Sequence, residues 1–334
     1  MPKYTWMLCA VLFFALSEMA TAQYTETLNS NRPGQSQGAY AVGKRVLQLE
    51  AGYDFGSDKH NLLNTDIDIW GIDFSARYGV WKEQLEISLL GRFQNNEITF
   101  LNGNAPMESF SDFETLTLGA KYLFYDPGKS NKEEEVNLYS YFANKKFKWK
   151  SLIPSVAVYA GANFGTKSNP FITVDQEGLS PTAAIITQNN WGRWVWVNNI
   201  IGEKIGTDFP SYIWITTMTH SFTPKIAGFL EYQLINGDLY ADNIIRFGGA
   251  YLITPDFQID VAALFNLKDT PKRQNVALGL SYRFDMHDED EKIIIEEDSP
   301  KTESKMDKKM KKKAARKKRR NKRKDAPDFD GDGN

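Results

Sequence analysis

A ten-residue segment, Asn275–Phe284, constrains the fold of this chain more than any other stretch. Every second residue in it is apolar, from Val276 to Phe284, and the residues between them are small or polar. Because the side chains of a strand alternate between two faces, the segment predicts a strand with one apolar and one polar face. Its length is about that of a tilted strand that crosses a bilayer. A half-buried strand of a soluble sandwich has the same pattern, so the rest of the chain decides between the two.

The same alternation recurs along the chain, and no helical period of comparable length precedes residue 285. An even number of such segments is typical of single-chain outer-membrane barrels. The sequence therefore predicts an all-β fold, a transmembrane antiparallel β-barrel of about 12 strands. Tyr282 and Phe284 end the last strand and resemble the assembly signal that outer-membrane barrels carry there. The expected strands are 46–55, 70–80, 84–94, 114–124, 155–164, 181–188, 193–201, 212–220, 225–235, 245–253, 257–265 and 275–284.

The lengths of the expected connections support a barrel over a sandwich. Short turns alternate with longer loops, and a transmembrane barrel keeps its short turns on the periplasmic side. The exception is residues 126–148, a long connection on the expected periplasmic side. It is either an inserted periplasmic loop or a place where the strand count slips. The short turns are 80–83, 189–192, 223–224 and 254–256, and the longer loops are 56–65, 95–111, 165–180 and 267–273.

The first 22 residues have the pattern of a secretory signal peptide. Lys3 precedes an apolar run from Met7 to Leu16, and Ala20-Thr21-Ala22 forms an A-x-A cleavage site. Cleavage after Ala22 removes Cys9, the single cysteine of the chain, so we expect no disulfide and no thiolate site. Export and the barrel pattern together predict the outer membrane of a Gram-negative bacterium. We expect contacts with outer-membrane lipid and with the barrel assembly machinery.

Residues 285–334 differ from everything before them. They are acidic at first and then strongly basic, and charge at this density predicts a disordered tail in the periplasm. Its partner would be the cell wall or another anionic molecule there, and not nucleic acid, because the chain is exported. Asp328, Asp330 and Asp332 partly match a calcium loop, but the chain ends before the remaining ligands. We therefore predict no metal site and no cofactor.

Several short motifs together resemble one family. They are Asn31-Arg32-Pro33-Gly34, Gly43-Lys44, Gln48-Leu49-Glu50 and Leu116-Thr117-Leu118-Gly119-Ala120-Lys121-Tyr122. The chain from about residue 28 to residue 284 resembles the outer-membrane barrels named "Putative MetA-pathway of phenol degradation", often labelled transporters. That family usually has Asp where this chain has Asn31, and it usually lacks segment 126–148 and the tail. The resemblance implies a barrel that passes small, often hydrophobic or aromatic, molecules.

Charged residues on the expected inner face are the candidate functional residues. They imply either a polar channel lining or pairs that close across the lumen. A hydrolase would need a serine near a histidine base, and His220 with Ser211, Ser221 or Asp208 could be arranged in this way. Nothing in the spacing favours it, so we predict that the protein is not an enzyme. The expected lumen-lining residues are Glu50, Asp73, Arg77, Glu86, Arg92, Lys121, Glu231, Arg246, Asp260 and Arg283.

Two functions from different classes follow from this inner face and the tail. The first is a channel for uptake of a small-molecule solute. The second is a structural barrel that is anchored to the cell wall, or to another anionic periplasmic partner, through its basic tail. Solute flux through the purified barrel distinguishes them, because only the first requires it.

Residues 23–44 form a polar lead-in to the first strand. A barrel of about twelve strands has a lumen that its own side chains cannot fill, since about eight strands is the close-packed limit. At about 3.3 Å per residue the lead-in is long enough to fold back into the lumen. We expect it to act as a plug in which Arg32 meets inward carboxylates, with Glu50 and Glu86 the nearest candidates in sequence, the alternative being a disordered periplasmic leader.

Overall fold

The computed structural model of the protein describes residues 27–101, 107–130, 149–166, 168–172 and 178–287. The predicted signal peptide and all but the first three residues of the predicted tail lie outside these ranges. The same is true of the three aspartates compared above with a calcium loop.

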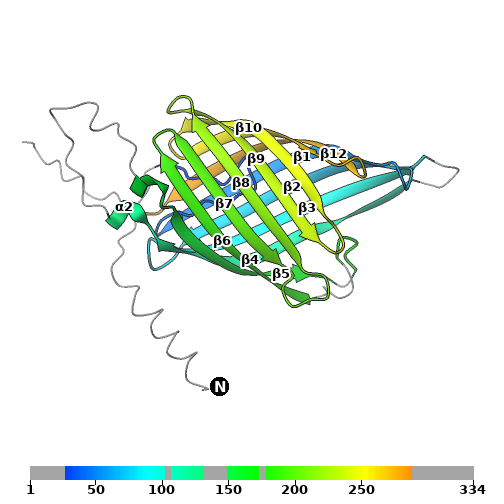
Figure 1. Ribbon diagram of the computed structural model, residues 1–334, viewed down its shortest axis with the longest axis horizontal. Helices are drawn as coiled ribbons and strands as arrows, with labels where there is room; N and C mark the ends of the chain where they lie inside the picture. The colour runs from blue at the N-terminus through cyan, green and yellow to red at the C-terminus, as the bar shows by residue number, and fades with distance from the viewer. Residues whose placement is uncertain (1–26, 102–106, 131–148, 167, 173–177, 288–334) are drawn as a thin grey trace, which may run out of the picture. The chain divides into compact units, whose positions relative to one another are not determined.

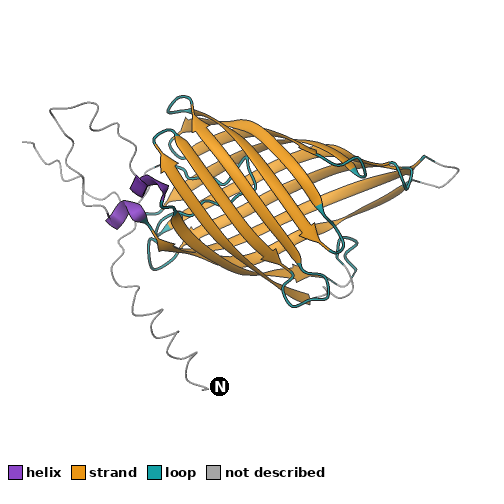
Figure 2. Ribbon diagram, in the orientation of Figure 1, coloured by secondary structure: helices purple, strands orange, loops and turns teal. Residues whose placement is uncertain are grey.

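Twelve antiparallel strands form a closed barrel in which each strand pairs with its neighbours in the chain, as predicted (Figure 1, Figure 2). The first strand closes the barrel by pairing with the last, from Val46 opposite Asp285 to Lys59 opposite Lys272. This pairing removes both free edges, which would otherwise expose unpaired backbone groups. The strands are β1 Val46–His60, β2 Thr65–Gly79, β3 Leu85–Phe100, β4 Glu108–Tyr125, β5 Ser155–Gly165, β6 Gly178–Trp191, β7 Trp194–Glu203, β8 Ser211–Ser221, β9 Ile226–Gly237, β10 Asp242–Thr254, β11 Phe257–Asn266 and β12 Lys272–Asp285.

The first four strands are longer than predicted. The loop expected at 56–65 shrinks to residues 61–64, and the loop expected at 95–111 shrinks to residues 101–107. Apolar side chains on the outer face mark only the part of a strand that faces lipid, and beyond it the outward residues are polar, such as Lys59 in β1, Asp66 in β2 and Glu97 in β3. The cross-strand ion pair between Lys59 and Asp66, 3.3 Å apart, belongs to this extension.

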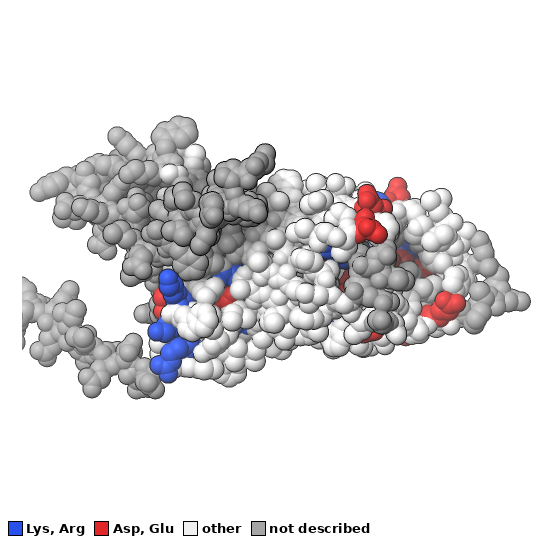
Figure 3. All heavy atoms as spheres, turned by 90° about the horizontal axis from the view of Figure 1, so that it is seen from below, with Lys and Arg blue, Asp and Glu red and all other residues white. Residues whose placement is uncertain are grey.

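Side chains alternate between the two faces of the wall. In β1, Glu50 and Asp54 point inward and are buried, whereas Leu49, Tyr53 and Phe55 point outward and are exposed. On the face shown in Figure 3, the uncovered middle of the wall carries no charged side chain, and charges gather toward the two ends. A polar inside and an apolar outer band are the features of a barrel surrounded by lipid. None of the described helices has the length and apolarity of a membrane-spanning segment.

The two ends of the barrel differ in their connections. We call the end that carries the β2–β3, β6–β7, β8–β9 and β10–β11 turns the turn end, and the opposite one the loop end. Chain direction also places the β4–β5 connection at the turn end. That connection holds two short helices, α2 (Pro127–Ser130) and η2 (Trp149–Leu152). Because β4 and β5 are direct neighbours in the sheet, the strand count does not slip there.

Phe284 lies at the turn end of the closing strand and packs against Tyr282, with ring centroids 4.6 Å apart. Both rings face outward on β12. We expect Phe284→Ala to reduce insertion into the outer membrane, because the last strand has to be recognised before it pairs with β1. Removal of residues 286–334 is the matched control and should leave insertion intact. The amount of barrel in outer-membrane fractions measures both, and the reverse pattern would contradict this assignment.

Candidate functional site: the lumen and the segment inside it

The lead-in segment, described from residue 27, lies inside the barrel. It enters at the turn end, where the Leu28 N–H donates to the carbonyl of Pro255 at 2.8 Å. It then contacts inward side chains of β1, β12, β11, β9, β7, β6, β4 and β3 before it joins β1. We call residues 27–45 the lumen segment. It crosses the lumen instead of leaving the barrel as a periplasmic leader.

Carboxylates of the wall bind the backbone of the lumen segment. The N–H of Asn31 donates to Glu50 at 3.2 Å, and the N–H of Val42 donates to Glu86 at 3.0 Å. Glu231 accepts from two successive N–H groups, those of Gln35 at 3.0 Å and Ser36 at 3.2 Å. An extended segment has no internal partners for its backbone groups, and leaving them unpaired inside a barrel is costly. Inward carboxylates on three strands therefore supply hydrogen-bond acceptors for the backbone N–H groups of the lumen segment.

Three inward amide side chains have the same role, and the sequence analysis missed them. Asn199 on β7 accepts from the N–H of Gln37 at 2.6 Å and donates to its carbonyl at 2.9 Å. Gln188 on β6 accepts from the N–H of Ala39, and Gln48 on β1 donates to the carbonyl of residue 29. Alternation along the strands assigns all three to the inner face. They were missed because only charged residues were considered as candidates.

Arg32 binds Asp260 of β11, with guanidinium nitrogens 3.3 and 3.4 Å from the carboxylate oxygens. Arg32 thus meets an inward carboxylate of the predicted lining, but neither of the two nearest candidates in sequence, Glu50 and Glu86. The guanidinium lies over Gly52 of β1 and Gly279 of β12, which pair with each other, and a Cβ at either position would overlap it. Two facing glycines thus form a slot for the arginine at the β1–β12 seam.

Glu50 and Glu86 instead bind a wall residue, Arg77. Its guanidinium donates to Glu86 at 2.9 and 3.0 Å and lies 3.5 Å from Glu50. Lys121 lies 3.2 Å from Glu86 and donates to the carbonyls of Gly38 and Tyr40 in the lumen segment. Arg77, Glu86 and Lys121 are completely or almost completely buried. We call these three residues the buried charge cluster.

The other predicted lumen-lining residues also point inward and pair with opposite charges. Arg92 binds Asp54 at 2.6 Å and Asp73 at 2.9 Å. Arg246 binds Glu231. Arg283 lies at the turn end, 3.5 Å from Asp285 and 3.7 Å from Asp256. The structure thus distributes the ten predicted residues into several separate ion-pair groups around the wall.

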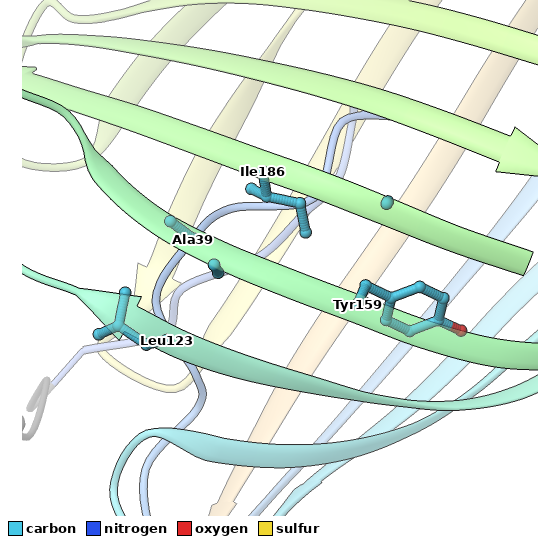
Figure 4. Packing of buried hydrophobic residues seen from close by; sticks show 6 residues of the cluster. Ala39, Leu123, Tyr159 and Ile186 are labelled. Carbon is cyan, nitrogen blue, oxygen red and sulfur yellow. The ribbon is translucent and has the colours of Figure 1, made fainter. Parts of the chain in front are cut away.

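The lumen segment also makes an apolar contact with the wall. Ala39 is completely buried in a cluster with inward residues of β4, β5 and β6 (Figure 4). The wall residues of this cluster are Leu123, Ala157, Tyr159, Ala184 and Ile186. Polar contacts on several strands and one apolar contact therefore hold the segment across the lumen.

A cavity of about 430 Å³ lies between the lumen segment and the loop end. Its two sides differ in chemistry. The wall from β1 to β4 and β12 contributes many charged and amide side chains, such as Asp54, Arg92 and Arg273, together with Ile69 and Leu90. The wall from β7 to β11 contributes Glu203, Gln233 and Arg246 and seven inward apolar side chains, Ile201, Ile213, Ile215, Ile235, Ile244, Ala262 and Leu264. We call these seven side chains the apolar wall.

The structure does not assemble the residues considered for catalysis. His220 points outward and packs against Trp194, with ring centroids 4.1 Å apart. Ser211 is the first residue of the same strand and His220 the tenth, so they are about 30 Å apart at about 3.3 Å per residue. Asp208 lies in the loop that precedes Ser211, and Ser221 follows His220 in the same strand, where successive side chains point to opposite faces. The described residues also contain no cluster of ligands that could hold a metal ion.

The closed barrel, its apolar outer band and its charged inner face define an outer-membrane β-barrel of porin-like architecture. The chain belongs to the family described as "Putative MetA-pathway of phenol degradation", whose profile matches residues 30–284. The resemblance noted in the sequence is confirmed. No relative with a curated description matches the chain.

Three solved structures show similarity to this chain over most of their length. The COG4313 outer membrane channel from Pseudomonas putida F1 has 11% identity and a TM-score of 0.49, covering 76% of this chain and 100% of that one. The KdgM porin has 10% identity and a TM-score of 0.40, covering 71% and 99%. The CymD monoaromatic hydrocarbon channel has 7% identity and a TM-score of 0.37, covering 73% and 90%.

Proposed function

We propose that the protein is an outer-membrane channel for uptake of small molecules that carry an apolar portion. The observation that carries this proposal is the apolar wall. The inner face of a barrel that passes only ions and sugars has no reason to present isoleucines, because burial against a polar solute brings them no stabilisation. A solute with an apolar body loses contact with water against this wall, at about 25 cal/mol per Å² of apolar surface buried.

The register makes the apolar wall continuous from β7 to β9. Ile201 on β7 is paired with Ile213 on β8, and Ile213 is paired with Ile235 on β9. Side chains directly opposite each other on one face of a sheet are in contact. The charged wall on the other side of the cavity offers hydrogen-bond partners, so a solute with a polar and an apolar part can satisfy both.

Swelling of proteoliposomes tests this proposal with leucine and asparagine, two zwitterions of nearly equal mass, of which leucine is the bulkier. We expect leucine to enter faster through the wild type, because its side chain can contact the apolar wall. The double variant Ile213→Asn/Ile235→Asn should lose this preference, whereas Thr117→Asn on the opposite wall should retain it.

Each result of the swelling assay decides a different part of the proposal. Equal entry of leucine and asparagine into wild-type liposomes would leave a channel but would remove the role of the apolar wall. Entry of neither amino acid would reject the channel and favour the alternative of a structural barrel. Migration of unboiled samples on a detergent gel confirms that every variant is folded.

A further inference from the structure

The charges that line the cavity are paired with one exception. Six carboxylates line it, and five of them lie within 3.5 Å of an arginine nitrogen. The five are Glu50, Asp54, Asp58, Asp73 and Glu114. All four arginines of the lining are also paired with a carboxylate. In the described part of the chain, the sixth carboxylate, Glu203, forms no salt bridge and no side-chain hydrogen bond, although the ammonium group of the next residue, Lys204, acts on it electrostatically.

Glu203 stands at the loop-end edge of the apolar wall. It is the last residue of β7 and points inward, two residues after Ile201 on the same face. Opposite it on β8 is Ser211, and the next inward residue of β8 is Ile213. The carboxylate is half-buried, so its hydration is incomplete. An unpaired charge beside apolar side chains is costly unless a partner of opposite charge completes it.

We propose that Glu203 and the adjacent isoleucines form a binding subsite for solutes that combine a protonated amine with an apolar body. The ammonium group would donate charge-assisted hydrogen bonds to the carboxylate. The apolar body would lie along Ile201, Ile213 and Ile235. A cation without an apolar body would gain only the first contact, and a solute with a carboxylate but no amine would be repelled.

This inference rests on the proposed channel function, because it names the class of solute that the channel receives. The unpaired carboxylate also gives the cavity lining an excess of negative charge, with six carboxylates against four arginines. Such an excess raises the local concentration of cations over anions. The negative charge of the lining would attract amines toward the cavity, and the Glu203 carboxylate would bind their ammonium group directly.

Isothermal titration calorimetry of the folded, detergent-solubilised protein tests the subsite with three probes. Benzylammonium has both features, methylammonium has only the charge, and benzoate has an apolar body of opposite charge. We expect benzylammonium to bind most tightly. Its affinity should fall roughly tenfold in Glu203→Gln, because a hydrogen bond to a charged group is lost, and should not change in Glu97→Gln, which alters an outward carboxylate of β3.

The outcomes separate this inference from the proposed function. Equal affinity of benzylammonium for wild type and Glu203→Gln would overturn the subsite. Binding of benzoate or methylammonium as tight as that of benzylammonium would also overturn it, and this comparison needs no variant. Leucine flux into proteoliposomes is measured separately, so the channel can stand when the subsite fails.

Discussion

Deletion of residues 27–40 is expected to raise the single-channel conductance severalfold. These residues cross the lumen and contact inward side chains on most strands, so they occupy most of the path for ions. Without them, a twelve-strand barrel has a lumen that its own side chains cannot close. Planar-bilayer recordings of the purified protein measure this change directly.

Arg32→Ala provides a graded comparison for the deletion. It removes the contact with Asp260 but keeps the backbone hydrogen bonds to Glu50 and Glu231, so a smaller rise in conductance is expected. Equal conductance of the wild type, Arg32→Ala and the deletion would show that the lumen segment does not constrict the channel. Because Arg32→Ala leaves the segment intact, it remains informative if the deletion variant folds poorly.

Arg77→Met is expected to cause the largest loss of stability among single substitutions of the wall. The methionine fills a similar volume but leaves Glu86 with Lys121 alone and removes the cationic partner of Glu50. Removal of one partner of a buried ion pair typically costs about 3–5 kcal/mol, because the remaining charge stays buried. The carbonyl of residue 29 also loses its bond to Arg77, which loosens the lumen segment.

Lys59→Met is the matched control for this prediction. Lys59 pairs with Asp66 at 3.3 Å, but its side chain is 60% exposed. Exposed pairs contribute at most about 1 kcal/mol, so the control should differ little from the wild type. Urea titrations of the barrel in lipid vesicles, followed by the gel mobility of unboiled samples, report both changes. Equal urea midpoints for Arg77→Met and Lys59→Met would contradict the stabilising role of the buried charge cluster.

The sequence predicted the wall well because alternation is a local signal. Segments such as 275–284 reveal which residues face lipid without any knowledge of their neighbours. The ends of β1 to β4 were missed for the same reason. Beyond the lipid the outward residues are polar, and the alternation of β1 ends at Phe55 although the backbone ladder continues to His60.

The contacts of the lumen could not be predicted from sequence distance. Glu50 and Glu86 are nearer to Arg32 in the chain, yet the closed barrel places Asp260 beside it. Which strand a segment meets depends on where it enters and how the wall curves. The position of Gly52 opposite Gly279 is likewise visible only in the register of the closed barrel.

The lumen segment contacts both partners of the β1–β12 pairing. Ser30 lies within hydrogen-bond distance of Glu50 on β1 and of Ser281 on β12, which is 251 residues away in the chain. Every other strand pairing joins strands that are consecutive in the chain. The β1–β12 pairing instead joins the first strand to the last, so it requires closure of a loop that contains the whole barrel sequence. A tether of about twenty residues that also binds β12 and β11 holds the two ends of the sheet together. The lumen segment, which narrows the pore, is therefore also positioned to lower the entropic cost of pairing β12 with β1.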